Sequence, residues 1–362
     1  MKKAGVGIIG CGAISPAYMS NIRDEFSGLL ALTACADINA EAARKRATEF
    51  GVPRACSVDE LLADPSVEIV VNLTNPEGHH GVTMAALRAG KHVFTEKPLG
   101  ISMKEGDEIV EAARAGGRTL AGAADTFLGA GLQSCRKLVD DGRIGTPVNA
   151  TAYVSISVKS ERYHRIGYGP MFDMSPYYIT ALLAILGPVK AVAGMARIPF
   201  PEKTAPGKDG TPGKTFKVET PSNIVGLMEF KSGPVAVITA SCDVAGYYPR
   251  TEIYGTSGTL VACDANGYRG GSTVRTPAGE EKIEPAGGFG KRGRALGIAE
   301  MAWAMREGRR PQAGGDMLYH VLEIMHAMHE SSREGRQVAV KSAWGRPEPF
   351  DFAAMKAAGE AS

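Results

Sequence analysis

The first third of the chain alternates short apolar runs with longer segments of helical periodicity. The apolar runs carry hydrophobic residues at nearly every position, as parallel strands covered on both faces do. They lie at residues 5–9, 30–36, 68–73, 92–95 and 119–123. Two helices between them begin with a capping-box pattern, Ser57 with Glu60 and Ser102 with Glu105. The alternation predicts a doubly wound parallel sheet, which binds its ligands at the carboxyl ends of the strands.

Beyond about residue 125, strand-type runs follow one another. Strands are expected at 148–158, 189–196, 224–230, 235–243, 251–254 and 337–340, and helices at 127–141, 295–306 and 318–334. The aperiodic segments 197–223 and 266–293 predict surface loops or hairpin tips. We therefore expect an α/β protein with an N-terminal domain over residues 1–124. A C-terminal α/β domain over 125–362 is expected to carry an open, mainly antiparallel sheet.

Composition narrows the class of protein. A chain of 362 residues that is 44% hydrophobic is long and apolar enough for two domains. Its 41 basic and 39 acidic residues are interspersed, which argues against a nucleic-acid partner. The longest apolar stretch, 179–186, is too short to cross a membrane. Six cysteines without a CxxC pair predict buried small residues in a reducing compartment, and the early first strand leaves no room for a signal peptide. We expect a cytoplasmic protein.

The first strand ends in GCGAIS at residues 10–15, a variant of the GxGxxG pattern that binds dinucleotides. Gly10 would allow the tight turn, and Gly12 would let the backbone approach a pyrophosphate held at the next helix N-terminus. An ordinary strand-to-helix turn is the alternative interpretation. We expect the cofactor to contact Gly10, Gly12, Ala13 and Ile14.

Asp37 ends the second strand, where a carboxylate accepts hydrogen bonds from the ribose hydroxyls of a dinucleotide. A carboxylate there repels the 2′-phosphate of NADP, and the next three residues supply no cation to compensate. The sequence therefore favours NAD over NADP. Alternatively, Asp37 caps the helix that begins near Asn39.

Two further clusters carry candidate chemistry. The fifth strand runs into Glu96 and Lys97, where a lysine can acidify or orient a substrate hydroxyl, although a solvated ion pair is the alternative. Asp173 and Tyr177 would share one face of a continuous helix. Pro176 requires that helix to kink or to begin near Ser175. Tyrosines packed into the core are the simpler interpretation of this cluster.

Taken in order, GCGAIS, LTNPEGHH, AGKHVFTEKPL, DTFLGAGLQ and GPMFDMSPYYITALLAILGPV resemble the Gfo/Idh/MocA oxidoreductases over essentially the whole chain. The resemblance implies an N-terminal Rossmann domain for NAD(P). It also implies a C-terminal α/β domain whose open sheet often mediates oligomerisation, hence a homo-oligomer, either dimer or tetramer. Substrates in this family are mostly sugars, cyclitols and related polyols.

The resemblance also assigns roles to residues. Lys97 matches the family's catalytic lysine, with Glu96 and Pro98 completing its motif. The cofactor-cleft loop corresponds to Thr74, Asn75, Pro76 and His79. Asp173 matches the aspartate of the DxGxH signature, and Tyr177 stands in place of its histidine. Ser175 replaces the usual glycine, which leaves the substrate pocket less defined than the chemistry.

We therefore expect oxidation of a secondary hydroxyl, with the hydride passing to nicotinamide. Tyr177 would be the base, assisted by Lys97, while Asp173 and His164 would hold substrate hydroxyls. Two rival interpretations are an NAD-dependent glycosidase and a non-catalytic nucleotide sensor of the same fold. His320, His326 and His329 share one helix pattern, but without carboxylate or cysteine partners we expect structural histidines and no metal.

Overall fold

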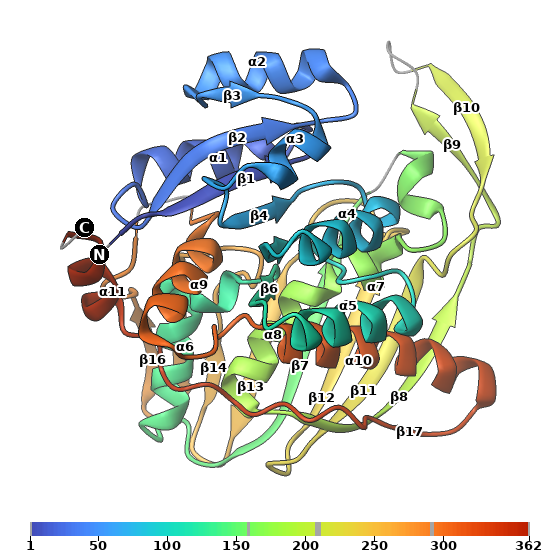
Figure 1. Ribbon diagram of the computed structural model, residues 1–362. Coiled ribbons are helices and arrows are strands. Elements are labelled where there is room, and N and C mark those ends of the chain that lie inside the picture. Colours follow the sequence, from blue (N-terminus) through green and yellow to red (C-terminus); the bar gives the residue numbers. More distant parts are fainter. Residues whose placement is uncertain (1, 158–159, 207–210, 290–292, 361–362) are drawn as a thin grey trace. The chain divides into compact units, whose positions relative to one another are not determined.

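The computed structural model describes residues 2–157, 160–206, 211–289 and 293–360 (Figure 1). The chain divides into two compact units. The first unit comprises Met1–Gly129, Gly287–Tyr319 and Phe350–Ser362, and the second comprises Ala130–Ala286 and His320–Pro349. The first unit thus draws on stretches of sequence that lie far apart along the chain.

The sheet of the first unit is entirely parallel, with strand order β3-β2-β1-β4-β5-β6. Its strands are β1 (Ala4–Ile9), β2 (Leu30–Ala36), β3 (Arg54–Ala55), β4 (Ile69–Asn72), β5 (His92–Thr95) and β6 (Leu120–Gly122). The winding reverses between β1 and β4, so the predicted doubly wound sheet is confirmed. Every residue of β4 is buried, which explains why its first three residues are apolar.

Helices connect these strands and complete the first unit. They are α1 (Ser15–Asp24), α2 (Ala40–Phe50), α3 (Val58–Ala63), α4 (Pro76–Arg88), α5 (Met103–Ala115), η1 (Thr126–Leu128), α9 (Leu296–Glu307) and α11 (Phe352–Glu360). The capping box of Ser57 and Glu60 has both of its bonds. At α5, the Glu105 amide donates to Ser102 Oγ (3.2 Å), but the Glu105 carboxylate accepts from the Ile101 amide (2.7 Å). Only half of the second predicted box is therefore formed.

The sheet of the second unit is mixed, with strand order β16-β15-β14-β13-β7-β12-β11-β8-β17. Its strands are β7 (Pro147–Ser155), β8 (Val189–Arg197), β11 (Asn223–Phe230), β12 (Val235–Ser241), β13 (Arg250–Gly255), β14 (Thr259–Val261), β15 (Ser272–Thr276), β16 (Gly279–Ile283) and β17 (Val338–Ala339). β7 and β12 pair in parallel, and the other pairings are antiparallel. The predicted C-terminal α/β architecture is confirmed.

Helices cover one face of this sheet and leave the other face open. The helices of the unit are α6 (Ala130–Asp140), η2 (Glu161–His164), α7 (Gly169–Asp173), α8 (Ser175–Leu186) and most of α10 (Gly315–Glu334). α8 is buried along its whole length. α10 approaches β8 and β11 closely, because a Cβ at Gly194 would lie 2.9 Å from the Met328 carbonyl oxygen. On β11, Ile224 and Met228 are buried, whereas Val225 and Leu227 face outward and are exposed.

Three predicted segments differ from the structure. The helix expected at 127–141 is split into η1 and α6. The aperiodic segment 197–223 contains a hairpin of β9 (Glu202–Pro206) and β10 (Pro212–Lys217), and 266–293 contains the β15–β16 hairpin. These strands are short and mostly exposed, with little beyond Phe216 buried on β10, so they lack the apolar alternation that marks a strand. None of the cysteines forms a disulfide in the described residues, and all are buried except Cys56.

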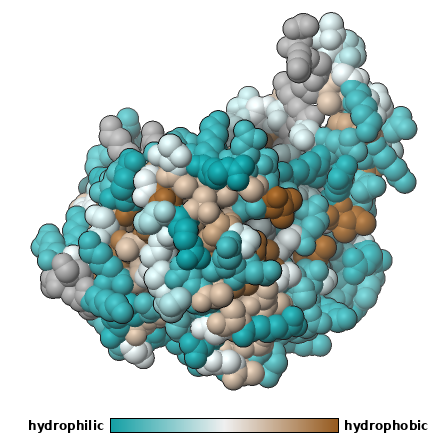
Figure 2. Space-filling view, turned by 45° about the horizontal axis from the view of Figure 1, so that its top comes forward, coloured by the Kyte–Doolittle hydropathy of each residue, from teal (hydrophilic) through white to brown (hydrophobic). Residues whose placement is uncertain are grey.

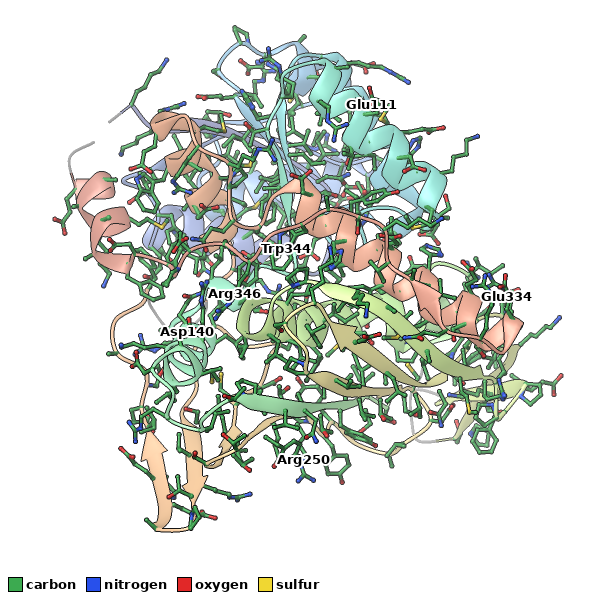
Figure 3. All side chains as sticks on the ribbon, turned by 90° about the horizontal axis from the view of Figure 1, so that it is seen from below. Glu111, Asp140, Arg250, Glu334, Trp344 and Arg346 are labelled. Atoms are coloured by element: carbon green, nitrogen blue, oxygen red, sulfur yellow. The ribbon has the colours of Figure 1, made fainter. Side chains whose placement is uncertain are left out.

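An extended segment near the C-terminus of the second unit is fastened by one arginine. Arg346 donates from Nη2 to both carboxylate oxygens of Asp140 (2.8 and 2.9 Å) and from Nε to the Ala184 carbonyl (2.7 Å) (Figure 3). It thereby ties this segment to α6 and α8. The molecular surface in Figure 2 is mainly hydrophilic, with apolar side chains in small patches. Across the described residues, no helix combines the length and the apolar character that a membrane span requires.

Candidate active site

The turn after β1 requires glycine at its first position. Gly10 has a φ of +103°, and a Cβ there would lie 2.7 Å from the Leu73 carbonyl carbon. Helix α1 then begins at Ser15, whose Oγ donates to the Gly12 carbonyl (2.8 Å). Gly12 and Ala13 are exposed, and a Cβ at Gly12 would meet open space. The turn thus presents accessible backbone at a helix N-terminus, as a pyrophosphate requires.

Asp37 joins the end of β2 to this turn. Its Oδ2 accepts from the Cys11 amide (2.7 Å), and its Oδ1 accepts from the Asn39 amide (2.8 Å). Helix α2 is capped by Asn39, whose side chain accepts from the Glu41 and Ala42 amides. The alternative in which Asp37 caps that helix is therefore wrong. Ile38 beside it is fully exposed, as a residue that covers a ligand would be before the ligand binds.

A buried asparagine that the sequence reasoning missed shapes the loop after β4. Asn72 accepts from the Thr74 hydroxyl (2.7 Å) and donates to the His79 carbonyl (3.0 Å). Asn75 stands at the N-cap of α4 without a side-chain capping bond. The signal was present, because an asparagine within an otherwise apolar strand must find partners when it is buried.

His79 links this loop to the turn after β5. It is buried, with Nδ1 2.7 Å from the Pro98 carbonyl oxygen and Nε2 3.0 Å from that of Thr74. Burial lowers the pKa of His79, and the charge of Lys97 acts in the same direction. His79 thus lies between the two predicted cofactor loops and helps to position them.

Glu96 is a buried carboxylate at the carboxyl end of β5. Its Oε1 accepts from the Tyr18 hydroxyl (2.7 Å), and its Oε2 accepts from the Lys97 amide (3.2 Å). Burial acts to raise the pKa of Glu96, but the charges of Arg294 and Lys97 outweigh it and hold that pKa below its usual value. Tyr18 comes from the helix after the glycine-rich turn, so this ionised carboxylate ties that helix to Lys97.

Arg294 is a second residue near the candidate site that the sequence did not predict. The Arg294 carbonyl accepts from Asn21 Nδ2 on α1 (2.8 Å), and its charge stabilises the Glu96 carboxylate. Arg294 lies in the stretch Gly287–Tyr319 that belongs to the first unit. Nothing in the local pattern relates it to Glu96, so only the fold brings the two residues together.

The remaining predicted residues belong to the second unit. Asp173 is the last residue of α7, and α8 begins at Ser175 with Pro176 in its first turn. Of the two outcomes that Pro176 allows, a kink or a helix start near Ser175, the structure has the second, because proline fits a first turn but not a helix interior. Tyr177 is buried in that first turn.

Tyr178 is clearly structural, in contrast to the adjacent candidate Tyr177. Its hydroxyl donates to Asp264 (3.0 Å), as does that of Tyr247 (2.7 Å). Burial, followed by the bond to Tyr247, raises the pKa of Tyr178. Tyr178 therefore remains a neutral phenol, buried on α8.

A partly buried ion pair lies in the same unit as Asp173. Lys203 Nζ is 2.6 Å from Asp243 Oδ1, and Asp243 Oδ2 accepts from the Ser222 hydroxyl (2.8 Å). Burial, opposed by Lys203 and supported by Asp173 and Asp243, raises the pKa of the Cys242 thiol to about 12. Asp173 and the Lys203–Asp243 pair thus act electrostatically on the same thiol. The sequence predicted only a loop at Lys203 and a strand end at Asp243.

His164 and His320 are buried in the second unit, whereas His326 and His329 are partly buried. His164 packs against the Phe216 ring (5.4 Å between centroids). His320 Nδ1 lies 2.6 Å from Ser342 Oγ, while Nε2 accepts from the Val189 amide. His326 and His329 pack edge-on against Phe172, the neighbour of Asp173. Over the described part of the chain, no three metal-ligating side chains gather.

Two family models match most of the chain. A family model described as "Oxidoreductase family, NAD-binding Rossmann fold" matches residues 4–123, and one described as "GFO/IDH/MocA C-terminal domain" matches 132–261. The chain is 28% identical to 1,5-anhydro-D-fructose reductase of Ensifer adhaerens over 288 residues, 76% of this chain and 81% of that protein. It is 26% identical to myo-inositol 2-dehydrogenase of Thermotoga maritima over 279 residues, 73% of this chain and 80% of that protein.

A solved structure shares the fold over nearly the full length. A levoglucosan dehydrogenase in complex with NADH and L-sorbose has a TM-score of 0.83, with 21% sequence identity. The match covers 94% of this chain and 99% of that one. At this identity the likeness concerns the fold alone.

Proposed function

The chain belongs to the Gfo/Idh/MocA oxidoreductase family and carries its NAD-binding Rossmann domain, and we propose that it oxidises a secondary hydroxyl of a sugar, cyclitol or related polyol. The observation that carries this proposal is the arrangement around Lys97. Its backbone is bound by the buried Glu96 carboxylate, which Tyr18 of the fingerprint helix also binds. Lys97 follows the carboxyl end of a parallel strand, where such a sheet binds its ligands, and this position suits it to act on a substrate hydroxyl.

The residues of the first unit fit NAD. The Gly10–Gly12 turn and the start of α1 would hold the pyrophosphate, and Asp37 retains lone pairs for the ribose hydroxyls. Ile38 would cover the adenine. The Asp37 carboxylate, without a cation in the next three residues, supports NAD in preference to NADP. The loop Thr74–Pro76, positioned by Asn72 and His79, would border the nicotinamide half.

NAD supplies the hydride acceptor at nicotinamide C4 when it is bound. The alcohol proton must leave as the hydride does, so the protein needs a positioned base. Tyr177 takes this proton as a phenolate in our proposal, and the Lys97 ammonium favours the phenolate over the phenol. Asp173 and His164 hold substrate hydroxyls.

The test compares Lys97→Met and Tyr177→Phe with Tyr178→Phe as the matched control. NAD⁺ reduction is screened across polyols, sugars and a cyclic dihydrodiol, with NADP⁺ in parallel. We expect turnover to fall about 10²- to 10⁴-fold in the first two variants, as for loss of acid–base catalysis, while NAD affinity stays within a factor of about three. Tyr178→Phe, which loses only a structural bond, should retain turnover per folded molecule.

Three results would contradict the proposal. Near-normal turnover in both Lys97→Met and Tyr177→Phe would remove their roles. Glycosidic bond cleavage without net NADH would indicate a glycosidase, and NAD binding without turnover of any polyol would indicate a nucleotide sensor.

We also propose that the chain forms a homo-oligomer and is cytoplasmic. The open face of the second sheet exposes Val225 and Leu227 on β11 beside Met195 on β8. Such a row of apolar side chains supports self-association into a dimer or tetramer. The cysteines without disulfides support a reducing compartment, hence the cytoplasm.

A further inference from the structure

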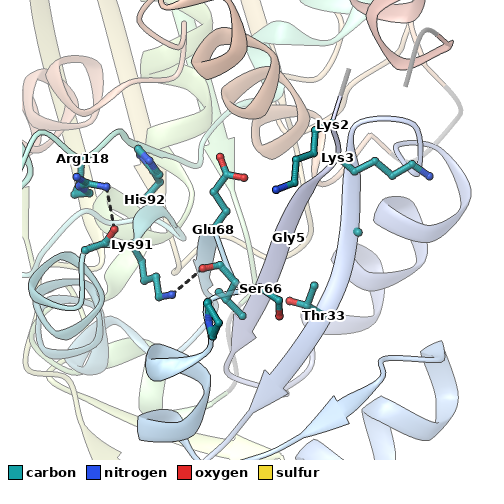
Figure 4. Close-up of a pocket in the computed structure, with 13 residues that line it drawn as sticks. Lys2, Lys3, Gly5, Thr33, Ser66, Glu68, Lys91, His92 and Arg118 are labelled. Atoms are coloured by element: carbon teal, nitrogen blue, oxygen red, sulfur yellow. Dashed lines mark hydrogen bonds between the residues drawn. The ribbon is translucent and has the colours of Figure 1, made fainter.

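A cavity of about 500 Å³ lies at the amino ends of the strands of the first unit (Figure 4). Its wall is formed by residues that precede or begin β1, β2, β4, β5 and β6. The fingerprint turn, Asp37 and Lys97 follow the carboxyl ends of the same strands. In a parallel sheet these two sets of ends lie at opposite edges, so the cavity is separate from the candidate cofactor site.

Four cationic side chains line the cavity: Lys2, Lys3, Lys91 and Arg118. Two of them are held by neutral carbonyl groups. Lys91 Nζ donates to the carbonyls of Asp64 (2.7 Å) and Val67 (2.9 Å). Arg118 donates from Nε to the Gly116 carbonyl (2.9 Å) and from Nη1 to the Gly90 carbonyl (3.1 Å). These bonds fix the positions of the two charges without neutralising them.

The carboxylate in the cavity wall is already matched. Glu68 receives both terminal nitrogens of Arg306, with Nη1–Oε1 at 2.6 Å and Nη2–Oε2 at 2.7 Å. The Arg306 bond lowers the pKa of Glu68, so the pair is a carboxylate with its own counter-ion. Among the residues that the structure describes, none of the four lining cations makes an ion pair with a carboxylate. Lys2 acts electrostatically on Glu68 and Lys91 acts on Asp64, but the four lining cations outnumber these two carboxylates, so the cavity keeps a net positive charge.

Neutral hydrogen-bonding groups complete the wall. His92 Nδ1 accepts from the Thr119 amide (2.9 Å), which leaves Nε2 as the protonated nitrogen. Burial, followed by the charge of Arg118, lowers the pKa of His92 and keeps the ring neutral. The Thr33 hydroxyl donates to the Val6 carbonyl (3.0 Å), so its oxygen can still accept a hydrogen bond.

We propose that this cavity binds a phosphate monoester of about the size of a sugar phosphate. A phosphate dianion offers three oxygens to several cations, which matches Lys91 and Arg118, held by carbonyl groups, and the two exposed N-terminal lysines. The volume falls within the usual range for small-molecule sites and exceeds what the phosphate group alone would fill. The hydroxyls of the ligand would face Thr33 and His92.

The test is isothermal titration calorimetry on the full chain saturated with NAD, so that the pyrophosphate site is occupied. The probes are glucose 6-phosphate and inorganic phosphate, with glucose as the uncharged control. We expect glucose 6-phosphate to bind and glucose not to bind. Raising the salt concentration should weaken the binding, because the recognition is electrostatic.

The decisive comparison uses variants that remove the cations. Arg118→Gln and the double variant Lys2→Gln/Lys3→Gln should each weaken glucose 6-phosphate binding at least about fivefold, or about 1 kcal/mol. Arg114→Gln, an exposed arginine on α5, is the matched control and should bind as the unaltered protein does. The double variant alters exposed side chains only, so a folding defect in Arg118→Gln does not prevent the test.

Each outcome bears on the proposal. Inorganic phosphate that binds as tightly as glucose 6-phosphate, with the same losses in the variants, supports a site for free phosphate. Binding that is unchanged in both cation variants overturns the proposal, as does no binding of glucose 6-phosphate at about 10 mM, the weak limit for a specific small-molecule site. Calorimetry reads binding and not turnover, so failure here is distinct from failure of the dehydrogenase assignment.

Discussion

The hydroxyl of Tyr18 donates a 2.7 Å hydrogen bond to the buried carboxylate of Glu96. This bond connects the helix that follows the glycine-rich turn to the strand end that carries Lys97. Two sequence motifs that are far apart along the chain are thereby held as one structural element. The cofactor turn and the candidate catalytic lysine should therefore respond together when the bond is removed.

Tyr18→Phe is expected to destabilise the protein and to weaken NAD binding. The substitution leaves one oxygen of a buried, ionised carboxylate without its donor, which costs about 1–3 kcal/mol of unfolding free energy. Tyr254→Phe is the matched control, because Tyr254 donates to the buried Glu252 in the second unit. Urea denaturation should show similar losses in both variants, but only Tyr18→Phe should weaken NAD. An unchanged NAD affinity in Tyr18→Phe would show that this bond does not couple the glycine-rich turn to the strand end that carries Lys97.

Replacing the ribose carboxylate should change the cofactor preference. In Asp37→Ser/Ile38→Arg, the repulsion of a 2′-phosphate is removed and a cation is added. We expect the ratio of kcat/KM for NAD to that for NADP to fall at least about tenfold, or about 1.4 kcal/mol. The ratio cancels any loss caused by breaking the Asp37 bond to the Cys11 amide. Asp59→Ser, on the exposed side of α3, is the control, and an equal shift there would rule out the assigned role.

Three histidines of α10, one buried and two partly buried, predict a loss of stability in mild acid. Burial lowers the pKa of His320, His326 and His329 to about 4 each, below the ordinary value of 6.5. The unfolded chain therefore binds more protons, so stability is complete above pH 6.5 and declines as the pH falls toward 4. Each ring contributes a slope of up to roughly 1.4 kcal/mol per pH unit.

His326→Phe tests this slope and retains a ring against Phe172. The urea midpoint, measured between pH 7.5 and pH 5, should depend less steeply on pH in this variant than in the unaltered protein. Identical pH profiles for His326→Phe and the unaltered chain would show that burial at this position does not control the acid response.

The open sheet face predicts the effect of a charge on assembly. Leu227→Lys places an ammonium in the exposed apolar row of β11, opposite Ala193 and Val237 on the neighbouring strands. We expect light scattering to report a smaller species than for the unaltered chain, because burying that charge is costly. Ile166→Lys, an equally apolar exposed position outside this sheet, should not change the mass. A monomeric unaltered chain would remove the proposed self-association.

The sequence predicted the elements whose signals are local. The run at β4 is apolar because both faces are covered, and the motif around Gly10 requires its glycine for steric reasons at one turn. β3 has two residues, too few to show a pattern, and the β9–β10 hairpin buries too little apolar surface to alternate.

The hydrogen-bond and charge network around Glu96 could not be predicted from local sequence patterns, for a different reason. Tyr18, Arg294 and Glu96 become neighbours only after the sheet has formed and the stretch around Arg294 has packed into the first unit. Tyrosine and arginine are common on helices and in loops, so neither residue carries a signal by itself. Buried asparagine is the exception, and Asn72 shows that a polar residue within an apolar strand indicates a hydrogen-bonding network.

The first unit contains residues from distant parts of the chain, and this constrains when it can complete its folding during translation. The Asp125 carboxylate accepts from the amide of Gly297 at the start of α9 (2.8 Å), and Ala121 bridges to Gly314. A ribosome releases the whole of Ala130–Ala286 before it synthesises these partners. Until then, one side of the nascent nucleotide-binding sheet lacks the residues that pack against it. The sheet can therefore bind NAD with full affinity only near the end of translation.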